Sequence, residues 1–204
     1  MAKLFLVRHG KSAWNKLGLW TGWTDVDLDE DGIEEARIAG ELLKDEHIDT
    51  VYTSELKRTH QTFEHIKQGS GKPDLGHTSH KELNERHYGI HTGKNKWQVK
   101  EDVGEEEFQN IRRGWDTKIP DGENLKDVHA RVVPFYEEKI KQDLKAGKNV
   151  LVVSHGNTLR ALVKHLENLS DQQVCDLEIG TGELYCYELD SEAQVTRKEI
   201  RTKK

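Results

Sequence analysis

The chain has 204 residues, of which 34% are hydrophobic and 33% charged, and its formal net charge at pH 7 is −6. This length suits one domain with a real core, so residues 1–204 are expected to form a single unit. The acidic balance excludes a general attraction to nucleic acid or to an anionic membrane, so an anionic substrate would need a local basic pocket.

Short apolar runs alternate along the chain with segments of helical periodicity. Strands are predicted at residues 4–7, 50–53, 77–80, 149–153, 183–189 and 194–200, the last two as edge strands. Helices are predicted after a cap at Asp29, after a cap at Ser54, at 105–114, from 121–124 to about 144 with Pro134 inside, and at 158–166. The segments 16–28 and 81–96 are predicted to be loops. This alternation predicts an α/β fold, a three-layer α/β/α sandwich around a mostly parallel sheet.

The first apolar run ends abruptly in Arg8, His9 and Gly10. Ligands of a parallel sheet bind beyond the carboxyl ends of its strands, which is where His9 would lie. The adjacent guanidinium disfavours a second positive charge, so His9 is expected to be neutral and nucleophilic. Gly10 has no Cβ, so a ligand could approach the backbone there. On this stretch alone, an ordinary surface Arg–His pair explains the sequence equally well.

The run at 149–153 ends in the same way, in His155 and Gly156. If the two strands are neighbours, both histidines lie at the same edge of the sheet. Arg58 adds a cation in the first turn of a helix, where the dipole is already positive, which suggests an anion bound to both. These groups together predict phosphoryl transfer. His9 would be the nucleophile, Arg8, Arg58 and His155 would hold the phosphoryl oxygens, and Glu85 would be the general acid.

Histidines also raise the alternative of a metal site. The spacing of His77, His80, His87 and His91 fits no common zinc pattern, and no cysteine is near, so no metal is expected. The chain has two cysteines, Cys175 and Cys186, which make neither a disulfide framework nor a zinc site. With no signal-like N-terminal segment either, a cytoplasmic location is expected.

Several motifs spread over nearly the whole chain resemble the cofactor-dependent phosphoglycerate mutases of the histidine phosphatase superfamily. They are LVRHG at 6–10, SAWN at 12–15, TGW at 21–23, YTSELKRT at 52–59, LNERHYG at 83–89, GKNK at 93–96, RRG at 112–114 and SHGNTLRAL at 154–162. The two His-Gly motifs mark the superfamily, whereas LNERHYG with the arginine pair marks the mutase branch. Lys11 departs from the family, which usually has Glu or Gln there, and we expect it to point to water.

The resemblance implies that His9 becomes phosphorylated, that Glu85 is the acid and base, and that His155, Arg8 and Arg58 stabilise the transferring group. It also implies substrate-binding roles for Ser12, Asn15, Thr21, Gly22, Arg86, His87, Tyr88, Lys96, Arg112, Arg113, Gly156 and Asn157. The implied reaction is the glycolytic interconversion of 3-phosphoglycerate and 2-phosphoglycerate, with 2,3-bisphosphoglycerate as phosphoryl donor. The alternatives are a small-molecule phosphatase on the same fold and a catalytically dead binding module. Oligomeric state stays open, with a homo-oligomer as one option.

Overall fold

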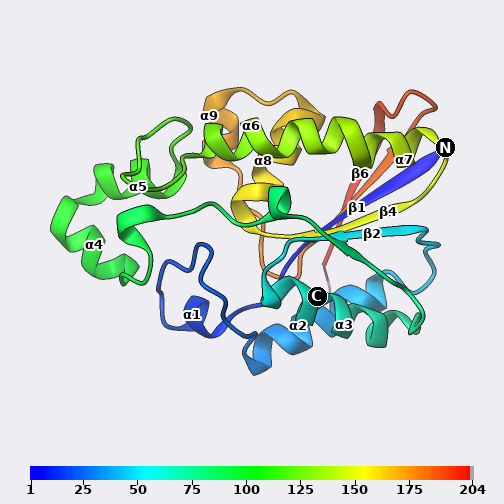
Figure 1. Cartoon of the computed structure of the whole chain (residues 1–204), viewed down its shortest axis with the longest axis horizontal. Helices are drawn as coiled ribbons and strands as arrows, with labels where there is room; N and C mark the ends of the chain where they lie inside the picture. The colour runs from blue at the N-terminus through cyan, green and yellow to red at the C-terminus, as the bar shows by residue number, and fades with distance from the viewer. Residues whose placement is uncertain (203–204) are drawn as a thin grey trace.

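The computed structural model describes residues 1–202, which form one six-stranded sheet with helices on both faces (Figure 1). The strands are β1 (Ala2–Arg8), β2 (Thr50–Thr53), β3 (Thr78–Ser79), β4 (Val150–Ser154), β5 (Leu184–Leu189) and β6 (Val195–Arg201). The helices are α1 (Ala13–Lys16), α2 (Glu30–Leu42), α3 (Lys57–Ser70), α4 (Lys96–Val103), α5 (Glu105–Arg113), α6 (Leu125–Phe135), α7 (Lys141–Lys145), α8 (Gly156–Glu167) and α9 (Asp171–Asp176). No helix within 1–202 is both long and apolar enough to cross a membrane.

The strand order is β3-β2-β4-β1-β5-β6. The first four are parallel to one another, and β5 pairs antiparallel with both of its neighbours, β1 and β6. The α/β class and the mostly parallel sheet are therefore confirmed. The prediction that 183–189 forms an edge strand is wrong, because β5 lies between β1 and β6 and is buried along almost its whole length.

Alternation along the central strands builds two separate apolar layers. On one face, Phe5 and Val7 pack with Leu43 and Phe63 of the α2–α3 side. On the other face, Leu4 and Leu6 pack with a larger set from α6, α8 and β5. Figure 1 shows α2 and α3 on one side of the sheet, α6 and α8 on the other, and α4 and α5 extending beyond one end. The three-layer sandwich follows from strands that are apolar on both sides.

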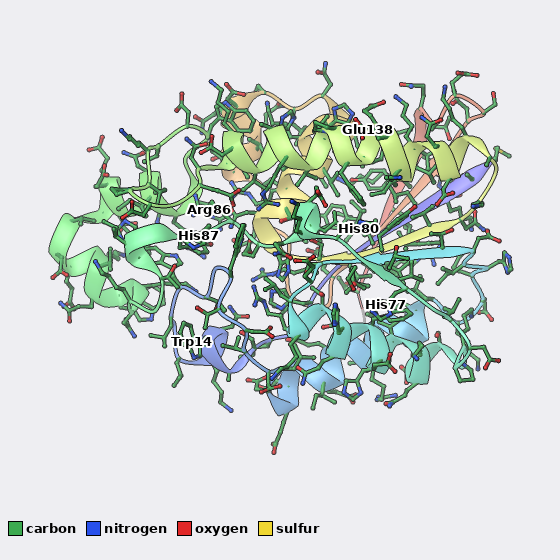
Figure 2. The ribbon with its side chains drawn as sticks, in the orientation of Figure 1. Trp14, His77, His80, Arg86, His87 and Glu138 are labelled. Atoms are coloured by element: carbon green, nitrogen blue, oxygen red, sulfur yellow. The ribbon has the colours of Figure 1, made fainter. Side chains whose placement is uncertain are left out.

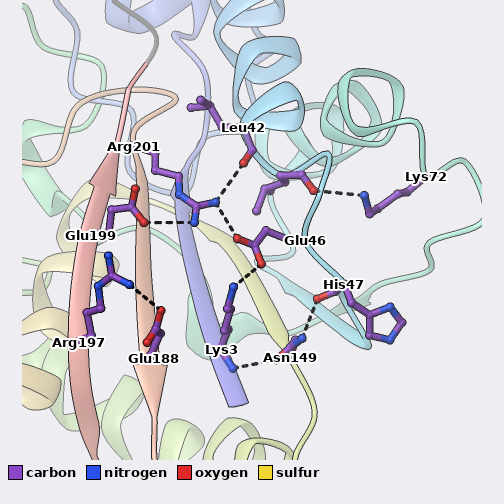
Figure 3. Close-up of polar contacts among 11 residues, drawn as sticks. Lys3, Leu42, Glu46, His47, Lys72, Asn149, Glu188, Arg197, Glu199 and Arg201 are labelled. Carbon is purple, nitrogen blue, oxygen red and sulfur yellow. Dashed lines mark hydrogen bonds and ion pairs between the residues drawn. The ribbon is translucent and has the colours of Figure 1, made fainter. Parts of the chain in front are cut away.

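Polar contacts tie the last strand to β1 and to the segment after α2 (Figure 3). The carboxylate of Glu46 lies 2.7 Å from Lys3 Nζ and 2.9 Å from an Arg201 guanidinium nitrogen. Arg201 also donates to Leu42 O at the end of α2. One carboxylate thus joins β1, β6 and the segment after α2.

Two predicted helix features turn out differently. Asp29 caps α2 through Gly32 N–H at 2.8 Å, as predicted, but α3 begins at Lys57 with Leu56 as its N-cap, so the predicted Ser54 cap is wrong. The predicted long helix is divided by a π-helical turn (Tyr136–Ile140) directly after Pro134. Proline lacks an N–H and crowds the preceding turn, which explains the widened helix.

The segment 81–96 is less irregular than predicted. It contains two short 3₁₀ turns, Lys81–Leu83 and Gly89–His91, and it leads straight into α4. Helices α1, α4 and α9 were not expected. Helices α1 and α9 have only four and six residues, and α4 has a single buried residue, Val99. None of the three therefore shows a hydrophobic periodicity that predicts a helix.

Candidate active site

His9 and His155 face each other at one edge of the sheet. Arg8 is paired with Ser154 in the β1–β4 register, and His9 N–H donates to Ser154 O at 2.9 Å. The two imidazole centroids are 4.9 Å apart, with their planes inclined by 60°. The expectation that adjacent parallel strands bring both histidines together is confirmed.

The His9 ring is held in one tautomer. Its Nδ1 lies 2.7 Å from Gly10 O, which can only accept, so Nδ1 carries the hydrogen and Nε2 keeps its lone pair. Burial, and then the charges of Arg58 and Arg8, lower the pKa of His9 well below its ordinary 6.5. A neutral imidazole with a free Nε2 is a suitable nucleophile towards phosphorus.

His155 is completely buried, and burial, Arg58 and His9 lower its pKa in the same direction. Its Nε2 lies 2.7 Å from Ser54 Oγ, whereas its Nδ1 has no protein partner. Ser54 Oγ also lies 2.8 Å from Thr59 Oγ1, so the single hydroxyl hydrogen of Ser54 serves either His155 or Thr59. The buried Nδ1 is the ring nitrogen left to contact a bound ligand.

The inner compartment of the site is a cavity of about 60 Å³ that His9 lines, whereas His155 lines neither compartment. Arg58 is fixed there by bonds to Thr24 O at 3.1 Å and Gly22 O at 2.8 Å. Buried donors without a protein partner remain on Arg8 Nε, Arg58 Nε and Thr21 Oγ1. Because buried donors are normally satisfied, they indicate a polar ligand at this point. The lining residues are Arg8, His9, Asn15, Leu19, Trp20, Thr21, Gly22, Arg58, Glu85, Tyr88 and Lys96.

An outer compartment of about 100 Å³ shares Arg8, Trp20, Glu85, Tyr88 and Lys96 with the inner one, so the two form one cleft. Burial, Arg112 and Arg8 lower the pKa of Lys96 to about 8, which leaves the amine mostly charged at neutral pH. The outer lining adds Arg112, Arg113, Gly156, Asn157, Arg160, Glu178 and Ile179. The cleft therefore has cations at both ends and can hold a ligand with two anionic groups.

Glu85 lies between the compartments. Its Oε1 accepts Arg86 N–H at 2.7 Å and Asn157 N–H, at the start of α8, at 3.2 Å. Trp23 Nε1 and Arg131 donate to the Glu85 carbonyl, which fixes the backbone. Oε2 is the carboxyl oxygen left to carry a proton towards a ligand.

Three residues of the implied substrate-binding set lie outside both compartments. Ser12 caps α1 and bonds to Asn15, so it positions that side chain. Arg86 is fully buried, stacks 4.5 Å over the Tyr88 ring and donates to Ile111 O and Arg112 O. His87 packs edge-on against Trp23, with the ring centroids 5.2 Å apart. These contacts support Tyr88, the end of α5 and the Glu85 loop.

Two further predictions from the motifs need comment. Gly10 was expected to admit a ligand, but a Cβ there would lie 2.1 Å from Gly32 O, so glycine is needed for the close approach of α2. Lys11 pairs with Asp31 at 2.9 Å on the surface rather than entering the cleft. Trp20 is buried, whereas Trp23 is 44% exposed and its Nε1 donates to the Glu85 carbonyl.

Sequence reasoning missed three residues of the site. Ser54 was read as a helix cap and instead contacts His155. Arg160 lies on a buried face of α8 and bonds to Asn157 Oδ1 and Val174 O, at 2.9 and 2.7 Å. A charged residue among the apolar positions of α8 was the available signal. Glu178 approaches the arginine pair from the segment after α9, and no pattern in the sequence indicated this contact.

The histidines considered as metal ligands are dispersed. His77 packs against Phe63 and His60, and His80 against Phe135, at a distance from His87 in Figure 2. Within residues 1–202, no group of three or more His, Cys, Asp or Glu side chains is arranged to hold a metal ion.

Comparison with known proteins agrees with this geometry. Residues 4–200 match the family described as "Histidine phosphatase superfamily (branch 1)". A 2,3-bisphosphoglycerate-dependent phosphoglycerate mutase from Parvibaculum lavamentivorans is 44% identical over 97% of this chain and 95% of its own.

Solved structures show the same fold. The alpha-ribazole phosphatase of Shigella flexneri aligns with a TM-score of 0.80 at 25% identity, over 96% of this chain and 94% of its own. A phosphoglycerate mutase from Bacillus anthracis aligns with a TM-score of 0.75 at 23% identity, over 98% and 92%. The chain belongs to the histidine phosphatase superfamily, and within it to the 2,3-bisphosphoglycerate-dependent phosphoglycerate mutases.

Proposed function

We propose that this protein interconverts 3-phosphoglycerate and 2-phosphoglycerate through a phosphohistidine on His9. The observation that carries the proposal is the two-compartment cleft, with a nucleophilic imidazole at one end and cations at both. Phosphoglycerates carry a phosphate and a carboxylate, and this charge distribution matches the cleft. Relatives named for the same reaction share over 40% of their residues with this chain.

The inner compartment supplies the groups for phosphoryl transfer. His9 Nε2 attacks phosphorus while Arg8, Arg58 and His155 stabilise the charge on the equatorial oxygens. Glu85 Oε2 donates a proton to the leaving oxygen as the P–O bond breaks and the P–N bond forms. In the reverse half-reaction, the resulting carboxylate removes the proton from the attacking hydroxyl.

The unpartnered donors of the inner compartment and the cations of the outer one fit 2,3-bisphosphoglycerate, which carries two phosphates and a carboxylate. When bound, it supplies the phosphoryl group that primes His9. Lys96, Arg112 and Arg113 would hold its distal groups. Such retention matters to a mutase, because a phosphorylated intermediate must stay and reorient, whereas a phosphatase releases its product.

The test is turnover of 3-phosphoglycerate with and without 2,3-bisphosphoglycerate, in EDTA. We expect turnover that the bisphosphate stimulates and EDTA leaves unchanged, with a labelled phosphoenzyme in the wild type. His9→Ala should lose both, whereas the control His47→Ala, at a side chain that is 78% exposed, should keep them. Turnover that persists in His9→Ala would contradict the mechanism.

A small-molecule phosphatase is the second candidate, because a phosphatase shares this fold with a TM-score of 0.80. It would hydrolyse phosphate monoesters without stimulation by the bisphosphate. The same assay with phosphate release as a second readout separates the two. A catalytically dead module is disfavoured, since His9, His155 and Glu85 are all present and assembled.

We further propose that the chain works as a single domain in the cytoplasm, without a nucleic-acid or membrane partner, and that a homo-oligomer is compatible with its surface. The acidic net charge of −6 supports the partner assignments. Size-exclusion chromatography with light scattering measures the oligomeric state directly.

A further inference from the structure

The carboxylate of Glu178 faces Arg112 and Arg113 in the outer compartment. Its Oε2 lies 2.8 Å from an Arg113 guanidinium nitrogen, and its Oε1 lies 3.8 Å from Arg112. The Glu178 side chain is 65% exposed, so few other contacts restrain it. The two arginines that are expected to hold a distal anionic group already face an anion from the chain itself.

The segment that carries Glu178 is anchored independently of this carboxylate. Arg113 donates to the carbonyl of Leu177 at 3.0 Å, and Arg8 donates to the carbonyl of Ile179 at 2.6 Å. The main-chain carbonyls of both neighbours of Glu178 are therefore held by arginine side chains. The side chain can leave the arginines by rotating about its own bonds, without moving the backbone.

Few acidic side chains line the outer compartment, so the charge of Glu178 matters for an anionic ligand. Among the described residues that line it, Glu85 and Glu178 are the acids, and Glu85 is engaged by N–H groups at the inner end. Partial burial raises the pKa of Glu178, but Arg113 and Arg112 hold it below its ordinary value overall. Glu178 is thus a charged counter-ion to Arg112 and Arg113 at neutral pH.

We infer that Glu178 is a specificity-determining residue, which competes with the distal anionic group of the substrate for Arg112 and Arg113. The inference rests on the proposed function for its substrate class. A ligand with two anionic ends binds only as the carboxylate withdraws, whereas a ligand with one phosphate fills the inner compartment and leaves Glu178 in place. The competition weakens retention of doubly anionic ligands and so favours release of product.

The opposite role, in which Glu178 holds Arg113 in position for the substrate, is disfavoured by the geometry. Arg113 is already fixed through Leu177 O, and its side chain is only 19% exposed. The end of α5 is held in addition by Arg86, which donates to Arg112 O at 3.2 Å. Removal of the Glu178 charge is therefore expected to expose prepared arginines rather than disorganise them.

The experiment compares binding of two ligands by titration calorimetry, without added bisphosphate. 3-Phosphoglycerate has two anionic ends and glycerol 3-phosphate has one. Glu178→Gln should bind 3-phosphoglycerate roughly two- to fivefold more tightly, the range expected for loss of an exposed ion pair, and glycerol 3-phosphate with unchanged affinity. The gain should shrink as salt is raised, because exposed charges are screened.

Glu183→Gln is the matched control. It removes the same charge from the same connecting segment, but Glu183 accepts Gly180 N–H at 2.7 Å and does not line the outer compartment. Its affinities should equal those of the wild type. Unchanged or weaker binding of 3-phosphoglycerate by Glu178→Gln, or an equal gain for both ligands, overturns the inference. If the selective gain is found but 3-phosphoglycerate is not turned over, the mutase proposal fails and the role of Glu178 stands.

Discussion

Replacing Glu85 by Gln tests the assignment of the general acid without disturbing its surroundings. Glu85 Oε1 accepts two backbone N–H groups, from Arg86 and Asn157, and a glutamine oxygen can accept both. The amide then occupies the place of Oε2 and has no transferable proton. The variant should therefore fold normally and bind substrate with a KM close to that of the wild type.

The expected loss is confined to the chemical step. General acid catalysis contributes about 10²–10⁴-fold, or roughly 3–5 kcal/mol at 1.36 kcal/mol per factor of ten, so kcat should fall by that amount. Steady-state turnover of 3-phosphoglycerate gives kcat, and rapid-quench measurement of the labelled enzyme gives the rate of His9 phosphorylation. Both should fall together.

The leaving group provides the control for this reasoning. An aryl phosphate whose phenol leaves as a stable anion needs little protonation, so its transfer to His9 should lose much less than that of 3-phosphoglycerate. An equal loss for both compounds would mean that the substitution disturbs the site in general. A decrease in kcat below about tenfold in a folded variant would remove Glu85 from the role of acid.

Three further predictions follow from the packing around the histidines. Ser54→Ala leaves the buried His155 Nε2 without its 2.7 Å partner, which typically costs about 1–3 kcal/mol. The kcat of this variant should therefore fall and the pH profile of kcat should shift, whereas the control Ser79→Ala should leave both unchanged. His9 and His155 have pKa values lowered well below 6.5 in the folded state, so below about pH 6.5 the unfolded chain binds protons that the folded chain does not. As pH is lowered through this range, the free energy of unfolding measured by urea denaturation should therefore fall, by up to roughly 1.4 kcal/mol per histidine per pH unit. Equal stability at pH 7 and pH 5.5 would contradict the burial of neutral rings. Gly32→Ala would bring a Cβ within 2.0 Å of Lys11 O and should lower the free energy of unfolding by about 1–3 kcal/mol. Gly76→Ala, whose Cβ would have nothing within 4 Å, should leave the free energy of unfolding unchanged.

The sequence allowed the catalytic centre to be predicted because its residues follow strands. His9 and His155 each come after an apolar run, and parallel pairing of β1 with β4 brings any such residues to one edge. Local patterns failed where a side chain acts across long sequence separations. Ser54 is indistinguishable in sequence from a helix cap, and its contact with His155 spans 101 positions. Glu178 lies in an irregular segment whose path is set by Arg8 and Arg113, so no periodicity could place it.

Gly10 shows how a correct motif can be given the wrong reason. Its neighbours in sequence suggested space for a ligand, but the residue that requires glycine there is Gly32, on a helix that begins 20 positions later. The pair lets α2 approach the loop that carries His9. Close packing of this kind depends on which segments meet, and that information is contained in the tertiary structure rather than in the motif.

The fold leaves the choice between mutase and phosphatase undecided, since a phosphatase aligns with this chain at a TM-score of 0.80. Under the proposed mechanism the inner compartment would serve either reaction, because His9 and Arg58, with His155 beside them, would act on the phosphoryl group whatever its destination. The proposed mutase and the alternative phosphatase differ in how long they hold the remainder of the ligand after its phosphoryl group has been transferred to His9. In this chain, that depends on α5 and on the segment between α9 and β5, neither of which belongs to the strands that carry the histidines. Reaction type in this architecture can therefore change through the outer segments while the catalytic histidines stay fixed.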